Sequence, residues 1–198
     1  MKPILTVYCP SLSHRPFVDQ ASLVRMAKLP IEFLMLQDND WRSTGMKTRQ
    51  LIQMARADYV MGMGDDDFLH PGIFEYILPL LQPKTHKPRY DMIGFNVTVL
   101  KDNRDPDLLC RLSPQFTREI EAWEGFTQMR PYAMMAPALK SLFDGITWAD
   151  NQSWAEDNAI AQQITPKIQT YHYIDKTLYY ARPLTTNRDR KEWSQRYE

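Results

Sequence analysis

Hydrophobic and polar positions alternate along the first hundred residues in blocks that predict strands and helices in turn. Short apolar runs stopped by polar residues or proline predict buried strands over 4–9, 31–37 and 58–63. Apolar positions at helical spacing predict helices within 17–27, over 46–56 and over 71–81, the last with proline in its first turn. The strands are apolar throughout, which is typical of a parallel sheet covered by helices on both faces.

This order of elements predicts a doubly wound α/β sheet, because crossovers between parallel strands are right-handed. Ligands of such sheets bind outside the carboxyl ends of the strands. Polar residues follow each predicted strand, at 11–14, 37–40 and 65–67. The last group is three consecutive aspartates, Asp65, Asp66 and Asp67, so the sequence places an acidic triplet at the ligand-binding edge.

The second half has a different pattern. It predicts a strand over 91–100, a loop-rich segment over 101–115 and a helix over 151–164. Residues 131–143 mix strand and short helix, two further strands are predicted within 167–184, and residues 186–198 form a charged tail. With no repeat or low-complexity tract, the chain is predicted to be a single domain over 1–198, with a mixed C-terminal extension of the sheet.

Charge and cysteine content narrow the function classes. The 198 residues carry 24 Lys and Arg against 24 Asp and Glu, so the net charge of zero removes the simplest argument for a dedicated nucleic-acid binder. Cys9 and Cys110 are far apart and suggest neither a disulfide framework nor a zinc site. The first apolar run is too short for a signal peptide and no segment reaches the length of a membrane span, so we expect a soluble cytoplasmic protein.

The acidic triplet suits Mg²⁺ or Mn²⁺, which take one or two carboxylates and leave positions for phosphate oxygens. The ordinary alternative is an acidic surface turn. The sequence has no G-x-x-x-x-G-K-[ST] loop, and GMGDD does not match G-x-G-x-x-G. Metal-mediated binding of a diphosphate therefore remains as the interpretation.

A second acidic pair, Glu156 and Asp157, lies at the start of a predicted helix. Ser153 and Glu156 have the spacing of a capping box, which accounts for Glu156 without any function. Capping does not require Asp157, which is a candidate general base.

Five stretches in the same order resemble a family 2 glycosyltransferase of the GT-A fold, over nearly the whole chain. They are TVYCPSLSHRP, IEFLMLQDND, ARADYVMGMGDDDFLHP, SLFDGITWADNQSWAEDNAI and KTLYYARPLTT. The resemblance implies a nucleotide-sugar-binding half over 1–100 and an acceptor-binding half over 101–185.

The resemblance also assigns roles to individual residues. It implies metal binding by Asp66, with Asp65 and Asp67 flanking it, and a weaker metal contact from His172. Asp38 and the Pro10–Ser11 loop would meet the base and ribose, and Lys47 and Arg49 would approach the phosphates. Asp157 matches the catalytic base of inverting members, beside Glu156.

Three positions depart from the family pattern. Gly64 stands where the family has the first Asp of D-x-D, Gln37 replaces the first acid of the usual pair, and Gln163 stands where members often have Arg. Which two of the three carboxylates act is therefore open.

The implied activity is Mn²⁺- or Mg²⁺-dependent transfer of a sugar, with inversion, from a nucleotide-diphosphate sugar such as a UDP-sugar. The acceptor would be a saccharide or glycoconjugate or, as an alternative, a hydroxylated base in DNA. Two other classes stay open: a metal-dependent nucleotidyltransferase or phosphohydrolase, and a non-catalytic module that binds sugar nucleotides.

Overall fold

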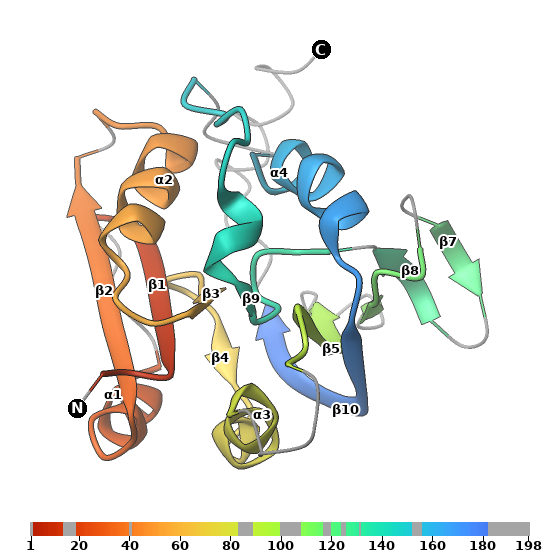
Figure 1. Cartoon of the computed structure of the whole chain (residues 1–198). Coiled ribbons are helices and arrows are strands. Elements are labelled where there is room, and N and C mark those ends of the chain that lie inside the picture. The colour runs from red at the N-terminus through yellow and green to blue at the C-terminus, as the bar shows by residue number, and fades with distance from the viewer. Residues whose placement is uncertain are drawn as a thin grey trace, which may run out of the picture.

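The computed structural model describes residues 2–13, 19–39, 41–82, 89–99, 108–116, 120–123, 126–130, 132–151 and 156–181 (Figure 1). The strands are β1 (Leu5–Leu12), β2 (Ile31–Asp38), β3 (Tyr59–Gly62), β4 (Phe68–Leu69), β5 (Met92–Val99), β6 (Leu108–Leu112), β7 (Ile120–Trp123), β8 (Phe126–Arg130), β9 (Ala138–Leu139) and β10 (Tyr171–Ala181). The helices are α1 (Gln20–Met26), α2 (Thr44–Met54), α3 (Ile73–Leu81) and α4 (Glu156–Ile164), with short 3₁₀ helices η1 (Lys140–Phe143) and η2 (Thr165–Lys167).

The first half has the predicted doubly wound arrangement. β1 pairs in parallel with β2 on one side and with β3 on the other, so the strand order is β2-β1-β3. The chain passes from β1 through α1 to β2, and then through α2 to β3 on the far side of β1. The direction of winding therefore reverses beside β1, and the carboxyl ends of β1 and β3 meet at this switch point.

The rest of the sheet is mixed. Its order continues from β3 through β9, β5, β6 and β8 to β7, with antiparallel pairs at β3–β9, β9–β5, β5–β6 and β8–β7. β6 and β8 are parallel, and β10 runs parallel to β5 while its far end pairs with β4 in the antiparallel sense. The mixed C-terminal extension is thereby confirmed.

Two details of the second half differ from the prediction. The segment 101–115, expected to be loop-rich, contains β6, and β7 and β8 were not predicted. The prediction of two strands within 167–184 is wrong, because β10 is a single strand that shifts its register between Ile174 and Thr177. Asp175 and Lys176 are exposed at this irregularity, so a polar pair that resembles a turn is accommodated as a bulge. The predicted charged tail lies outside the described residues.

One hydrophobic core joins the sheet to helices α2, α3 and α4. Apolar side chains of α3 recur at Ile73, Phe74, Ile77 and Leu81, which gives the helix one buried face. The same core contains residues of β1, β3, β5, α2 and α4, among them Val7, Met61, Phe95, Leu51, Ile52, Ile160 and Ile164. Within the described residues, no helix is long and apolar enough to cross a membrane.

Candidate active site at the strand ends

The acidic turn after β3 is joined directly to the end of β1. The Ser11 hydroxyl donates to Asp65 Oδ2 at 2.8 Å, and the Leu12 amide donates to the same oxygen at 3.2 Å. Ser11 and Asp65 are both buried. This contact spans the switch point, so the acidic triplet lies at the carboxyl ends of β1 and β3, where the order of elements predicts it.

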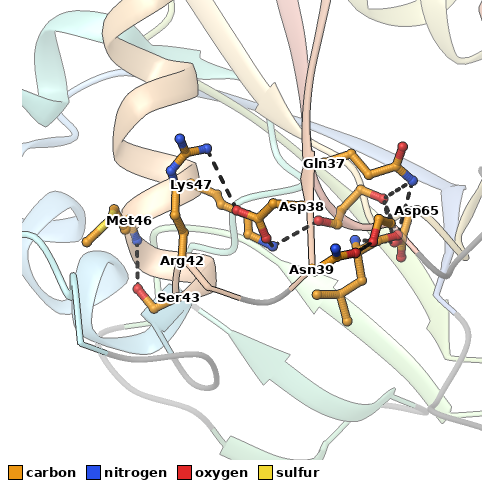
Figure 2. A network of polar contacts seen from close by, with 11 residues as sticks. Gln37, Asp38, Asn39, Arg42, Ser43, Met46, Lys47 and Asp65 are labelled. Atoms are coloured by element: carbon orange, nitrogen blue, oxygen red, sulfur yellow. Dashed lines mark hydrogen bonds and ion pairs between the residues drawn. The ribbon is translucent and has the colours of Figure 1, made fainter.

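A buried lysine connects this point to the end of β2 (Figure 2). Lys47 Nζ lies 2.8 Å from Asp38 Oδ1 and donates to the Ser11 carbonyl at 2.9 Å. The side chains of Lys47 and Asp38 are only 3% and 5% exposed, and Arg42 Nη1 approaches the other carboxylate oxygen of Asp38 at 3.7 Å. Lys47 therefore ties α2, β1 and β2 together, rather than extending toward a ligand as the resemblance implies.

The start of α2 has further contacts. The Ser43 side chain caps the helix by accepting from the Met46 amide at 3.1 Å, and its hydroxyl also donates to the Asp150 carbonyl. Arg49 Nη1 lies 2.6 Å from Asp150 Oδ2. Arg49 thus joins α2 to the segment that precedes α4, and the structure gives it a protein carboxylate as its partner.

The other two acids of the turn have different surroundings. Asp67 is buried and accepts a hydrogen bond from the Tyr179 hydroxyl of β10 at 2.5 Å. Asp66, between the two buried acids, is partly exposed. Within the described parts of the chain, no group of three or more His, Cys, Asp or Glu side chains is arranged to hold a metal ion by protein ligands alone.

The acidic triplet affects the pKa of Cys9, a residue of β1. Burial raises the pKa of Cys9, and the negative charges of Asp65, Asp67 and Asp66 raise it further. The thiol is fully buried and therefore stays protonated, which identifies it as a packed side chain rather than a nucleophile.

The second acidic pair lies at the start of α4. Asp157 Oδ2 accepts from Arg130 Nη2 at 3.1 Å, and its Oδ1 accepts from the Asn158 amide at 2.8 Å. Burial and the charge of Asp157 both raise the pKa of Tyr132, whose buried hydroxyl has no hydrogen-bond partner among the described residues. Helix α4 begins at Glu156, whose side chain is not described, and Ser153 of the predicted capping box lies outside the described residues.

Two of the predicted site residues, His172 and Pro10, lie within strands of the sheet. His172 lies at the start of β10, opposite Ile93, and its ring centroid is 5.3 Å from that of Tyr90. Tyr179, which contacts the acidic turn, is seven positions further along the strand, so the structure does not bring His172 to the triplet. Pro10 is a strand residue of β1, opposite Leu36 of β2.

Two partners of the candidate acids were not found from the sequence. Tyr179 is 112 positions from Asp67, and Arg130 is 27 positions from Asp157. Tyr179 lies in an apolar run that predicts only a buried strand, and no local pattern identifies its hydroxyl partner. Two tryptophans near the second acidic pair, Trp148 and Trp154, are candidates to stack on an acceptor sugar. Trp148 stacks on Phe143 with ring centroids 6.1 Å apart, and Trp154 lies outside the described residues.

Comparisons with known proteins identify the fold. No family model and no curated protein matches the chain. Among solved structures, S. aureus TarS 1–349 matches with a TM-score of 0.58 and 13% identity over 90% of this chain, and its complex with UDP-GlcNAc with 0.59 and 12% over 93%. The complex of TarS 1–349 with UDP gives 0.58 and 13% over 91%. Each of these matches covers 60% of TarS 1–349, and the match to the longer TarS chain covers 37% of it, so this chain spans less than two thirds of either. The predicted GT-A fold is confirmed.

Proposed function

We propose that this chain is a family 2-like glycosyltransferase that moves a sugar from a UDP-sugar to an acceptor hydroxyl with inversion at the anomeric carbon. The observation that carries the proposal is the convergence of the β1 end, the β2 end and the acidic turn at the switch point. TarS, which has the same fold, forms a complex with UDP-GlcNAc, and this supports a nucleotide sugar as the donor.

The donor would lie across the ends of β1 and β2. Asp38 lies 2.8 Å from Lys47 and 3.7 Å from Arg42 at the end of β2. An ionised carboxylate there accepts hydrogen bonds from base and ribose groups, and the Pro10–Ser11 backbone would line the same position. Lys47 acts by orienting Asp38 and the Ser11 carbonyl.

The acidic turn fits a divalent cation that takes part of its ligands from the donor. Mg²⁺ is usually bound by one or two carboxylates together with substrate phosphates, so a turn with one partly exposed aspartate between two anchored ones has the required donor type. Asp66 would hold Mn²⁺ or Mg²⁺, with Asp65 and Asp67 beside it. When bound, the cation offsets the negative charge that develops on the departing diphosphate.

Asp157 would act as the general base. It takes the proton of the acceptor hydroxyl as that oxygen bonds to the anomeric carbon and the bond from this carbon to the diphosphate oxygen breaks. Arg130 and the Asn158 amide each bond one oxygen of the carboxylate. A carboxylate has about four lone-pair positions, so these two bonds fix its orientation and leave capacity for the acceptor hydroxyl.

The first test removes the proposed metal ligand. We expect Asp66→Ala to lower Mn²⁺-dependent release of UDP from a UDP-sugar by at least ~10³-fold, because several kcal/mol of leaving-group stabilisation are lost. A panel of nucleotide sugars with Mn²⁺ identifies the donor, and chromatography of the products gives the rate. Release of intact UDP separates a glycosyltransferase from a nucleotidyltransferase or phosphohydrolase, which would release pyrophosphate or phosphate.

The matched control is Asp58→Asn, at the opposite end of β3. Asp58 is half exposed and pairs with Lys2 and Arg89, away from the acidic turn. The Asp58→Asn variant should release UDP at the wild-type rate. Near-normal turnover by Asp66→Ala would refute the assignment of the metal ligand.

One observation favours a second candidate, a non-catalytic module that binds sugar nucleotides: Asp157 already bonds Arg130 and Asn158. Asp157→Asn distinguishes the two. For a transferase, we expect a ~10²- to 10⁴-fold loss of kcat with unchanged UDP affinity in calorimetry. A binding module would show UDP affinity without turnover in the wild type, and this substitution would change nothing.

For the acceptor, we propose a saccharide or glycoconjugate hydroxyl, with a hydroxylated base in DNA as the alternative. Two groups of basic residues in the sequence would suit the phosphates of DNA. They are Lys84, His86, Lys87 and Arg89, and the tail residues Arg188, Arg190, Lys191 and Arg196. Arg89 pairs with Asp58, and the other seven lie outside the described residues. Binding to duplex DNA that weakens steeply with salt would favour the alternative, and indifference to DNA would remove it.

A further inference from the structure

The buried hydroxyl of Tyr179 makes two contacts with the acidic turn. It accepts a hydrogen bond from the Gly64 amide at 2.9 Å and donates one to Asp67 Oδ2 at 2.5 Å. A carboxylate oxygen accepts hydrogen bonds, so the Tyr179 hydroxyl is the donor to Asp67. One side chain therefore bridges the first and last residues of the segment Gly64–Asp67.

The strand pairing fixes the position of this hydroxyl. β10 pairs with β4, the two-residue strand directly after the triplet, with Tyr179 opposite Leu69 and Tyr180 opposite Phe68. The Tyr179 side chain is 1% exposed within the core. Because the backbone on both sides of the turn is anchored, the hydroxyl meets Asp67 without any need for the turn to rearrange.

Gly64 makes room for this arrangement. A Cβ atom added at position 64 would lie 2.4 Å from Asp67 Oδ2, far inside van der Waals contact. The Asp67 carboxylate thus packs against the backbone of residue 64, where a side chain would otherwise project. Position 64 is the first position of the D-x-D pattern. A side chain there would overlap the Asp67 oxygen that accepts the hydrogen bond from Tyr179, so glycine at this position and that hydrogen bond belong together.

We propose that Tyr179 is a positioning residue, which together with Gly64 holds Asp67 as part of the framework of the turn, so that Asp66 presents the metal-binding carboxylate. This inference rests on the proposed function and answers which of the three acids acts directly. Asp65 is anchored on the other side by Ser11 and Leu12, so both flanking acids orient the central one. Partners of this kind commonly determine the geometry of a metal ligand without touching the metal.

The test measures metal affinity apart from turnover. With saturating UDP, Mn²⁺ is titrated into wild type, Tyr179→Phe and the matched control Tyr180→Phe, and free Mn²⁺ is read by electron paramagnetic resonance. Tyr180 is the next residue of the same strand, opposite Phe68. We expect Tyr179→Phe to weaken Mn²⁺ binding by about 10- to 100-fold, as is typical when a partner of a metal ligand is lost. Tyr180→Phe should bind like the wild type.

Two further measurements separate positioning from general damage to the fold. Metal-free UDP affinity should be the same in Tyr179→Phe and wild type, because the hydroxyl does not touch the β1 and β2 ends. The double variant Tyr179→Phe with Asp67→Asn should be no weaker for Mn²⁺ than the worse single variant, since both remove one interaction. If Tyr179→Phe fails to fold, Gly64→Ala, which displaces Asp67 by contact, should show the same loss of Mn²⁺ affinity.

The outcomes are distinct. Equal Mn²⁺ affinity in Tyr179→Phe and Tyr180→Phe, with a wild type that binds Mn²⁺ and UDP together, would overturn the positioning role and leave the proposed function standing. A parallel loss of metal-free UDP affinity would overturn it too, since it would indicate general damage. A wild type that binds neither UDP nor Mn²⁺ with UDP would refute the proposed function, and this inference with it.

Discussion

Two ion pairs at opposite ends of strands β2, β1 and β3 are held in contrasting ways. At the amino end, Asp58 pairs with Lys2 at 2.6 Å and Arg89 at 3.1 Å, and the side chains of Asp58 and Lys2 are 52% and 65% exposed. At the carboxyl end, Lys47 and Asp38 are paired in an almost completely buried position, and Asp65 and Asp67 are buried beside them.

The difference shows which of the two pairs loses solvation free energy when the chain folds. Charges that stay in water lose little solvation on pairing, and exposed pairs contribute little to stability. Buried charges lose solvation, and proteins tend to accept that cost at functional sites. The Ser11 hydroxyl and the Leu12 amide donate to Asp65, and the Tyr179 hydroxyl donates to Asp67, and such hydrogen bonds orient a buried carboxylate.

The largest effect is expected from breaking the buried pair. Lys47→Met removes the charge that lies 2.8 Å from Asp38 and the donor to the Ser11 carbonyl, while Asp38 stays buried. We expect the free energy of unfolding to fall by about 3–5 kcal/mol, as for other buried pairs that lose one partner. Urea denaturation followed by circular dichroism measures it.

The control is the exposed pair at the other end. Lys2→Met removes the partner of Asp58, and because both side chains are largely in solvent we expect a loss of less than about 1 kcal/mol. Equal effects of the two substitutions would show that the ends do not differ in energy as their burial indicates.

A smaller effect is expected at Glu32, on β2 near the amino end. Burial opposes its ionisation, but hydrogen bonds from the Arg56 amide, Thr6 and the Arg56 guanidinium outweigh burial and lower the pKa of Glu32. A lowered pKa in the folded state adds stability above the unfolded pKa of 4.5, and this is lost as pH falls through the folded value. We expect Glu32→Gln to cost about 1–2 kcal/mol at pH 7.

The pH series supplies the check. Urea denaturation of wild type and Glu32→Gln at pH 7, 5 and 3 should show a difference that shrinks as the pH falls below 4.5, where Glu32 becomes protonated in the unfolded chain and the advantage of the folded state is progressively lost. A difference that stays constant down to pH 3 would show that ionisation of Glu32 is not the source of the stabilisation.

The sequence predicted the first half well because its information is local. Apolar runs and helical spacing identify β1, α1, β2, α2, β3 and α3, though not the two-residue strand β4, and the order of these elements places the triplet at the carboxyl end of β3. The sequence could not predict the direction in which individual side chains point. Lys47 was assigned to phosphates, but the face of α2 on which it lies points it at Asp38, and that depends on how the helix packs on the sheet.

The second half was harder because its contacts are long-range and its strands are short. The sharp change from apolar to polar at Asp175 and Lys176 indicates a turn by local rules, whereas pairing with β5 carries the strand through it. The partnership of Tyr179 with Asp67 likewise exists only because β10 returns to pair with β4.

The burial of Cys9 has a practical consequence. Both cysteines of the chain are buried in the structure, and Cys9 lies on β1 within the field of the acidic triplet. A thiol that is packed away and kept protonated reacts with alkylating reagents only when its surroundings open. The rate at which Cys9 is alkylated therefore reports how often the strand that carries Ser11 opens. Mass spectrometry measures this rate without any introduced label.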